Sequence, residues 1–230
     1  MSVLALQSCT DNLVYTGADI EVVLTGNTYK AAFTESSPVS TFNSGNQILL
    51  NASGSLQIDN RILTYMDNQW KAENEFSWSD ITGKTNITAL YPVYPDLDYI
   101  QENLYKNNSL EDILYVKDEF PAGNSIHLQF KHLFSLLTLY LDRDLQTNLQ
   151  KIEITCPAVS SIIPKSAEIV PADNETYTTT IAQVSPSGNY SFIVPPVKNM
   201  VIAINMVTNG KKYTTQLETK SFTGNKEYTY

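Results

Sequence analysis

The chain has 230 residues, of which 42% are hydrophobic and 17% charged, so it is expected to fold around a sizeable core and not to be disordered. Its 15 Lys and Arg residues stand against 24 Asp and Glu residues, and the resulting net charge of −9 argues against nucleic acid as a partner. The longest apolar run, from Leu133 to Leu141, is well short of the roughly 20 residues that cross a bilayer.

The first nine residues are typical of the end of a secretory signal. They form an apolar run that ends in Ser8-Cys9, and Leu6-Gln7-Ser8-Cys9 resembles a bacterial lipobox, in which the thiol is lipidated and the preceding residues are removed. A full signal has a charged start and about 15–30 residues, so we expect the sequence to begin inside its signal. The alternative is a disordered tail with an incidental cysteine. Lipidation of Cys9 would leave Cys156 alone, without a disulfide and expected to be a small buried hydrophobe.

Residues 19–25 predict the first strand. Ile20, Val22 and Leu24 alternate with Glu21, Val23 and Thr25, which leaves one face fully apolar. Turn-rich sequence follows, and strand character then returns in several short segments, the last of them after a short helix over residues 98–105. Those strand segments are 47–52, 62–65, 70–72 (forming a hairpin with 62–65 around Asp67-Asn68), 76–78, 87–91 and 113–116.

The second half continues the all-β pattern. Residues 126–141 alternate at first and then become apolar on both faces, which predicts a strand buried on both sides. Asn209-Gly210 predicts a tight hairpin turn between strands 201–207 and 212–217. About seven short strands in each half favour two β-sandwich domains. We place their boundary near Pro121-Ala122-Gly123-Asn124, which divides the chain into a signal remnant (1–9) and domains of residues 10–125 and 126–230.

No residue pattern indicates catalysis. His127 and His132 fall on opposite faces of a strand, which excludes a shared metal, and His132 is expected to be a hydrogen-bonded core histidine. Neighbouring carboxylates fall in loops and at strand ends, where solvated surface is the default and weak Ca²⁺ binding the alternative. Phosphate-binding glycine loops, nucleophile motifs and paired-cysteine motifs are missing from the sequence. We therefore expect no enzyme activity, no catalytic residue, no cofactor and no metal site.

Aromatic residues concentrate in the first half, at Trp70, Trp78, Tyr91, Tyr94 and Tyr99. Flat rings can stack on sugar rings, although core packing is the commoner use of such residues. One hypothesis for function is therefore a surface lipoprotein that binds a host or bacterial glycan through Trp70 and Trp78.

Several short motifs resemble those of the fimbrillin (Mfa-like) family of Bacteroidales. This resemblance spans essentially the whole chain and implies two tandem transthyretin-like antiparallel β-sandwich domains. The strand at 128–137 carries the most specific motif. The matching segments are Asn68-Gln69-Trp70, Phe76-Ser77-Trp78, Thr88-Ala89-Leu90-Tyr91-Pro92, Leu128-Gln129-Phe130-Lys131-His132-Leu133-Phe134-Ser135-Leu136-Leu137, Ser191-Phe192-Ile193-Val194-Pro195-Pro196 and Gly224-Asn225-Lys226-Glu227-Tyr228-Thr229-Tyr230.

The resemblance also implies a mode of assembly. Family members are lipid-anchored precursors at the outer membrane, and a trypsin-like protease removes their first strand so that another pilus subunit can donate a replacement. The equivalent cut would follow Lys30, where the family usually has Arg, and would displace the strand that carries Ile20, Val22 and Leu24. Because the sequence stops at Tyr230, where stalk subunits continue into a donor strand, we expect a tip or accessory subunit of a cell-surface fimbrium, or else a truncated gene.

Overall fold

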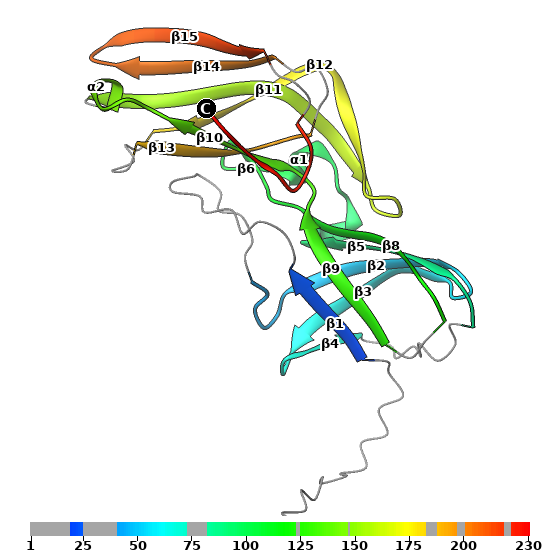
Figure 1. Ribbon diagram of the computed structural model, residues 1–230. Coiled ribbons are helices and arrows are strands. Elements are labelled where there is room, and N and C mark those ends of the chain that lie inside the picture. The colour runs from blue at the N-terminus through cyan, green and yellow to red at the C-terminus, as the bar shows by residue number, and fades with distance from the viewer. Residues whose placement is uncertain are drawn as a thin grey trace, which may run out of the picture.

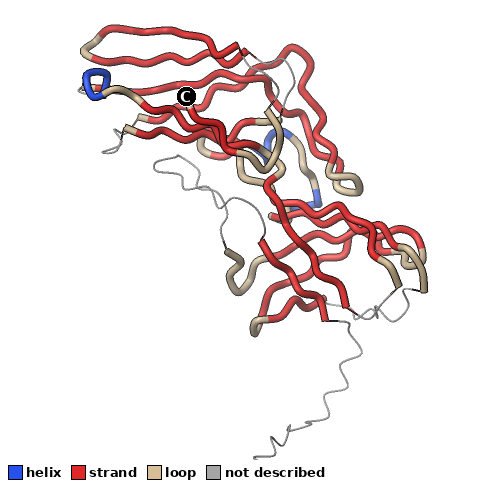
Figure 2. Tube along the Cα trace, in the orientation of Figure 1, coloured by secondary structure: helices blue, strands red, loops and turns tan. Residues whose placement is uncertain are grey.

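The computed structural model describes residues 19–24, 41–72, 82–122, 125–146, 148–182, 188–196, 201–218 and 222–230. Strands make up most of this part, and the helices are single turns, as Figure 2 shows in red and blue. The all-β fold predicted from the sequence is therefore confirmed. The transthyretin-like topology of its domains stays a prediction.

The first half of the chain contributes strands and two short helical turns. The helix α1 (Gln101–Leu104) lies within the segment expected to be helical, residues 98–105, and a 3-10 turn at Pro95–Leu97 lies just before that segment. The strands are β1 (Asp19–Leu24), β2 (Gln47–Gly54), β3 (Ile58–Met66), β4 (Gln69–Ala72), β5 (Thr85–Tyr91), β6 (Tyr105–Lys106), β7 (Ser109–Leu110), β8 (Leu114–Phe120) and β9 (Ser125–His132).

The second half contains seven further strands among the described residues. One helical turn, α2 (Arg143–Gln146), separates the first two of them. The strands are β10 (Ser135–Tyr140), β11 (Leu149–Ile163), β12 (Glu168–Ile181), β13 (Asn189–Val194), β14 (Val201–Thr208), β15 (Lys211–Glu218) and β16 (Glu227–Thr229).

One sheet organises the first half. Its strand order is β1-β9-β8-β5-β2-β3-β4, and its inner face is covered by a group of apolar side chains that we call the first core cluster. β9 pairs with β8 only at His132 and Lys131 and then turns away, so that β9 and β1 cross over the rest of the sheet (Figure 1). The first core cluster includes Ile48, Leu50, Ile87, Leu114, Ile126, Leu128 and Phe130, all of them 0–2% exposed.

The second half is a sandwich of two sheets, with strand orders β13-β10-β16 and β12-β11-β14-β15 (Figure 1). The second core cluster lies between these sheets and includes Leu137, Ile152, Tyr190, Phe192 and Ile202. Most neighbours run antiparallel, but β16 runs parallel to β10, as β1 does to β9. The first sheet and the sheet β13-β10-β16 are therefore mixed, each through one parallel pair, while the sheet β12-β11-β14-β15 is antiparallel, as the resemblance implies.

A third group of buried side chains, which we call the shared cluster, joins the two halves. It combines Leu49 and Leu90 from the first sheet, the segment from Tyr94 to Ile113, and side chains of the second half. Its second-half members are Leu136, Val159, Ile162, Ala167 and Ile193. Because the apolar contact is continuous across the two halves, we expect them to fold together.

The division between the halves falls later in the chain than expected. The predicted strand over 126–141 is two strands, because the chain bends at Leu133-Phe134 between β9 and β10. β9 belongs to the first sheet and β10 to the second sandwich. We therefore draw the boundary at residues 133–134 and not at Asn124. An apolar run that passes from one core to the next gives no sequence signal of this change.

Candidate functional site

The edge of the first sheet is the place where a strand could be exchanged. β1 holds this edge and pairs in parallel with β9 over six residues, from Asp19 opposite Ser125 to Leu24 opposite Phe130. This register sets the backbone of Ile20, Val22 and Leu24 beside Ile126, Leu128 and Phe130. In Figure 1 the two strands, blue and green, lie side by side in front of β3 and β4.

β9 is the strand on which β1 rests, and its sequence alternates strictly. Ile126, Leu128 and Phe130 are 0–2% exposed in the first core cluster, while His127, Gln129 and Lys131 face solvent. Over 125–130, the only strand that the described part of the chain pairs with β9 is β1. The apolar face of β9 is thus fixed by the core, while its backbone edge depends on β1.

A buried polar pair fixes the far end of β9. His132 and Asp112 are 5% and 4% exposed, and Nδ1 of the imidazole lies 2.8 Å from Oδ2 of the carboxylate. The backbone N–H of Leu133 donates to the carbonyl of Ile113 at 2.7 Å, and the His132 N–H donates to the side-chain oxygen of Asn225. His132 is therefore the hydrogen-bonded core histidine that the sequence predicts, and it holds the corner at which the chain leaves the first sheet.

The aromatic residues do not form one platform among the described residues. Trp70 is half-buried against the first core cluster, with its ring centroid 5.2 Å from that of Phe42 and 5.1 Å from that of Tyr65. Tyr94 and Tyr99 instead belong to the shared cluster, where they are 4% and 2% exposed. Burial raises the pKa of both phenols, and a hydrogen bond from Tyr94 to Glu111 raises that of Tyr94 further. Glycan binding through Trp70 and Trp78 stays a prediction.

Three predicted sites fall outside the described residues. Cys9, Lys30 and Trp78 lie in segments of which the structure gives no account. Lipidation of Cys9, cleavage after Lys30 and sugar stacking on Trp78 therefore stay predictions. Cys156 is described, and it is the buried thiol that the sequence predicts, with its pKa raised by burial to about 12.

The sequence did not reveal which strand neighbours the first one. The alternation of Ile126, Leu128 and Phe130 predicts a strand, but the turn residues Gly123-Asn124 before it favour a place in the second domain. Parallel pairing between strands a hundred residues apart carries no local signal, since it follows from the way the sheet closes. Residues 125–130 are thus the partner of β1 that sequence reasoning missed.

The helices and the metal-ligating side chains of the described residues bear on two other kinds of site. None of the helices found there is long and apolar enough to span a membrane. Nor does that part of the chain bring together three or more His, Cys, Asp or Glu side chains in a way that could hold a metal ion.

The fold defines an all-β protein of two joined units, with the N-terminal strand β1 at the edge of the first sheet. The sequence model of the fimbrillin-like family matches residues 32–230, and the chain belongs to this family. The resemblance seen in the short motifs is thereby confirmed. A search of curated proteins finds no match.

Solved structures support the same fold. A candidate cell adhesion protein from Bacteroides uniformis ATCC 8492 is similar with a TM-score of 0.59 and 12% identity, over 93% of this chain and 93% of that chain. A second candidate cell adhesion protein, from Bacteroides ovatus ATCC 8483, gives a TM-score of 0.57 and 13% identity over 92% of this chain and 91% of that one. At these identities the likeness shows the fold alone.

Proposed function

We propose that this protein is a non-enzymatic structural subunit of a cell-surface pilus and that it assembles by strand exchange at the edge of its first sheet. Membership of the fimbrillin-like family supports a role in a pilus or in adhesion at the cell surface. The observation that carries the mechanism is the position of β1, an edge strand paired along its whole length with β9. The tip or accessory position stays a prediction from the sequence.

Removal of β1 would leave an acceptor edge. The N–H and C=O groups of β9 that point toward β1 would lose their partners between Ser125 and Phe130, and unpaired edges recruit other strands. Three apolar residues of the incoming strand, taking the positions of Ile20, Val22 and Leu24, would together regain roughly 5–9 kcal/mol of side-chain burial. A neighbouring subunit with an alternating apolar segment could supply this strand by β-augmentation.

Proteolysis after Lys30 would release the strand. The cut would leave β1 on one fragment and every other described strand on the other fragment, held to it by pairing with β9 and by contacts with β4. We expect limited trypsin digestion of the native protein to cut after Lys30 before it cuts at Arg61 or Lys71, which lie within β3 and β4. Mass spectrometry of the fragments, with a Lys30→Gln variant as control, checks this order. Early cleavage at Arg61 would count against the proposal.

The precursor would be anchored by lipid at the outer membrane. We propose Cys9 as the lipidated residue, because Leu6-Gln7-Ser8-Cys9 has the pattern of a lipobox. When the chain is expressed behind a complete lipoprotein signal, labelled palmitate should enter the protein and should be lost in a Cys9→Ala variant. Incorporation that survives this substitution unchanged would remove the anchor from the account without affecting strand exchange.

A further inference from the structure

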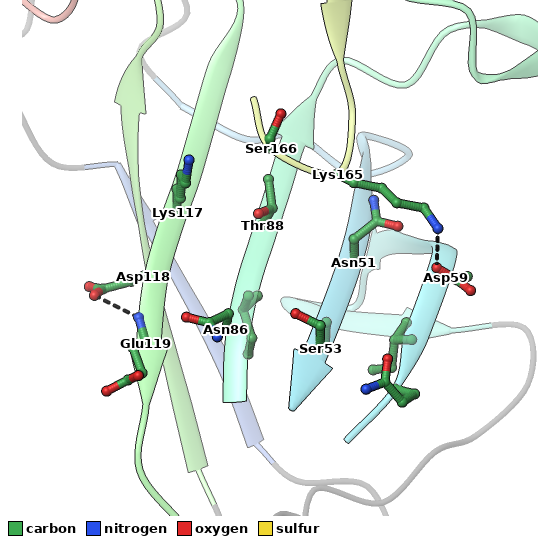
Figure 3. Close-up of a pocket in the computed structure, with 14 residues that line it drawn as sticks. Asn51, Ser53, Asp59, Asn86, Thr88, Lys117, Asp118, Glu119, Lys165 and Ser166 are labelled. Carbon is green, nitrogen blue, oxygen red and sulfur yellow. Dashed lines mark hydrogen bonds and ion pairs between the residues drawn. The ribbon is translucent and has the colours of Figure 1, made fainter. Parts of the chain in front are cut away.

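A polar hollow lies on the outer face of the first sheet, away from the first core cluster (Figure 3). Side chains of β2, β3, β5 and β8 form its floor, and the turn between β11 and β12 closes over one end with Lys165 and Ser166. Its volume of about 640 Å³ lies within the range of about 300–1,000 Å³ that is typical of small-molecule sites.

The strand register builds the floor as a grid. Lys117, Thr88 and Asn51 stand opposite one another on β8, β5 and β2. One step further along the same strands, Glu119, Asn86 and Ser53 form a second row. Neighbours within a row are about 5 Å apart and the two rows about 7 Å apart, so the grid has the dimensions of one or two sugar rings.

On the same face of the sheet, the next residues along the strands on the other side of the Asn51–Thr88 pair are apolar. Leu49 and Leu90, in register on β2 and β5, are buried in the shared cluster. The sequence thus switches from apolar to polar along each strand at the point where the second half stops covering the sheet. Packing between the two halves does not require this polar row.

One floor residue presents an unused hydrogen-bond donor. Asn51 is only 5% exposed, and its Oδ1 accepts the backbone N–H of Asn60 at 2.9 Å. This contact fixes the orientation of the amide, since an oxygen must face the Asn60 N–H. The Nδ2 group is buried in the wall of the hollow and has no hydrogen-bond partner among the described residues. A buried donor left in this way is unusual and calls for a ligand or water.

The covering turn presents a second unused group. Oγ of Ser166 is buried and also lacks a hydrogen-bond partner in the described part of the chain. Its neighbour Lys165 reaches across to Asp59 on β3, with Nζ 2.6 Å from Oδ1, and this ion pair holds the turn against the sheet. Unpaired polar atoms therefore occur on both the floor and the cover of the same hollow.

The charges of the lining select against an ionic ligand. Lys117 and Lys165 stand against Asp59, Asp118 and Glu119, two positive groups against three negative ones. Three of these charges are already in ion pairs, Lys165 with Asp59 and Glu119 with Lys84, which leaves Lys117 and Asp118, one of each sign. The remaining lining is rich in amide and hydroxyl groups, and none of its fourteen residues is aromatic.

We infer that this hollow binds a neutral hydroxyl-rich ligand, a saccharide of one or two rings. Sugar hydroxyls both donate and accept, so they match a floor of Asn, Ser and Thr side chains. Nδ2 of Asn51 and Oγ of Ser166 are fully buried in this structure, so each side chain turns toward the hollow when a sugar hydroxyl bonds it. This inference goes beyond the proposed role as a pilus subunit and does not depend on strand exchange. It also differs from sugar stacking on Trp70 or Trp78, neither of which lines the hollow.

Nuclear magnetic resonance tests the inference at the residue itself. The side-chain amide signal of Asn51 is followed in the whole chain while methyl glycosides of glucose, galactose, mannose and N-acetylglucosamine are added one at a time. At least one glycoside should shift this signal saturably. Inorganic phosphate, calcium chloride and a short acidic peptide should leave it unchanged. If no glycoside shifts the signal, or if phosphate shifts it instead, the saccharide assignment is wrong.

Two variants complete the test. Asn51→Asp keeps the acceptor for the Asn60 N–H and replaces the donor by an oxygen, and Ser166→Ala deletes the hydroxyl of the cover. Each should weaken glycoside binding by about tenfold or more, measured by calorimetry. Ser166→Ala removes an unpaired group and should not lower the melting temperature, so it remains informative if Asn51→Asp folds poorly. Thr214→Ala, an exposed change on β15, is the matched control and should bind normally. Normal binding by both site variants would overturn the inference.

Discussion

His132 and Asp112 form a buried polar pair at the corner where the chain passes from the first sheet to the second sandwich. Replacing Asp112 by Leu removes the carboxylate from a buried imidazole, and the free energy of unfolding should fall by about 3 kcal/mol. The double variant Asp112→Leu and His132→Phe should lose less unfolding free energy than the two single variants lose together, because neither member of the pair is then buried without the other. Urea denaturation of the four proteins measures this coupling. Additive losses would show that the two side chains do not act as a pair.

The burial of Cys156 and Tyr105 makes the stability of the protein depend on pH in the alkaline range. Burial raises the pKa of each to about 12, above the ordinary values of 9.0 and 10.0. The unfolded chain therefore loses these protons at lower pH than the folded protein does, so stability is complete below about pH 9 and falls as the pH rises toward 12. In chemical denaturation between pH 8 and about pH 12, a Cys156→Ala variant should show a shallower decline. An identical decline would contradict the burial of the thiol.

The same burial predicts that the thiol is unreactive. In a Cys9→Ser background, which leaves Cys156 as the single cysteine, Ellman's reagent should not react with the native protein at pH 8. Full reaction is expected in guanidinium chloride. Rapid labelling of the native protein would show that the second core cluster opens far more readily than its packing implies.

At the scale of elements, the turn before β16 depends on one glycine. A Cβ at Gly224 would lie 2.3 Å from the carbonyl oxygen of Leu133, a backbone atom at the corner between β9 and β10. Gly224→Ala should therefore destabilise the protein by about 2 kcal/mol or more. Gly83→Ala is the matched control, because the nearest atom to its Cβ is a side-chain carbon at 3.7 Å, and it should change stability by less than about 0.5 kcal/mol. Thermal melting of the two variants compares them directly.

Hairpins are the elements that the sequence predicts best. Asp67-Asn68 and Asn209-Gly210 both adopt positive φ angles and connect β3 to β4 and β14 to β15, as their residue types require. The long paired strands β11 and β12 contain Pro157 and Pro171, residues that usually interrupt a strand ladder. The structure accommodates both prolines beside register shifts in the β11–β12 pair. Local turn chemistry is visible in sequence, whereas the effect of a proline depends on the pairing around it.

The candidate site shows the same limit. The apolar alternation of Ile20, Val22 and Leu24 predicts a strand at residues 19–24, and the structure places β1 there. Its partner strand and its parallel direction depend on contacts across the chain. The polar hollow was not anticipated either, since it combines two rows from three strands with a turn at Lys165-Ser166. Long-range assembly of this kind has no short motif.

At the scale of the whole molecule, the shared cluster should make the two halves unfold together. Fluorescence of Trp70 and Trp78 reports on the first half, while far-ultraviolet circular dichroism reports on strands in both halves. The two signals should give coincident denaturation curves in the wild type. Phe134 is 1% exposed in the shared cluster. Replacing it by Ala should lower the free energy of unfolding by about 3–5 kcal/mol and should separate the two denaturation curves.

Phe192 is the matched control for this experiment. It is equally buried, at 1% exposed, but belongs to the second core cluster alone. Phe192→Ala should lower stability and leave the two curves coincident. Curves that are already separate in the wild type would mean that the halves fold independently and that the shared cluster contributes little.

Hydrogen exchange at β9 tests strand exchange most directly. Between Ile126 and Phe130, the β9 amides that point toward β1 should be protected in the intact protein, lose protection when trypsin has cut after Lys30 and the fragment with β1 has been removed, and regain it when a synthetic peptide of residues 17–27 is added. The same peptide with Ile20, Val22 and Leu24 replaced by Ser should restore nothing. If the β9 amides stay protected without β1, or if the protein unfolds and no peptide rescues it, β9 is not an acceptor edge and the strand-exchange account is contradicted.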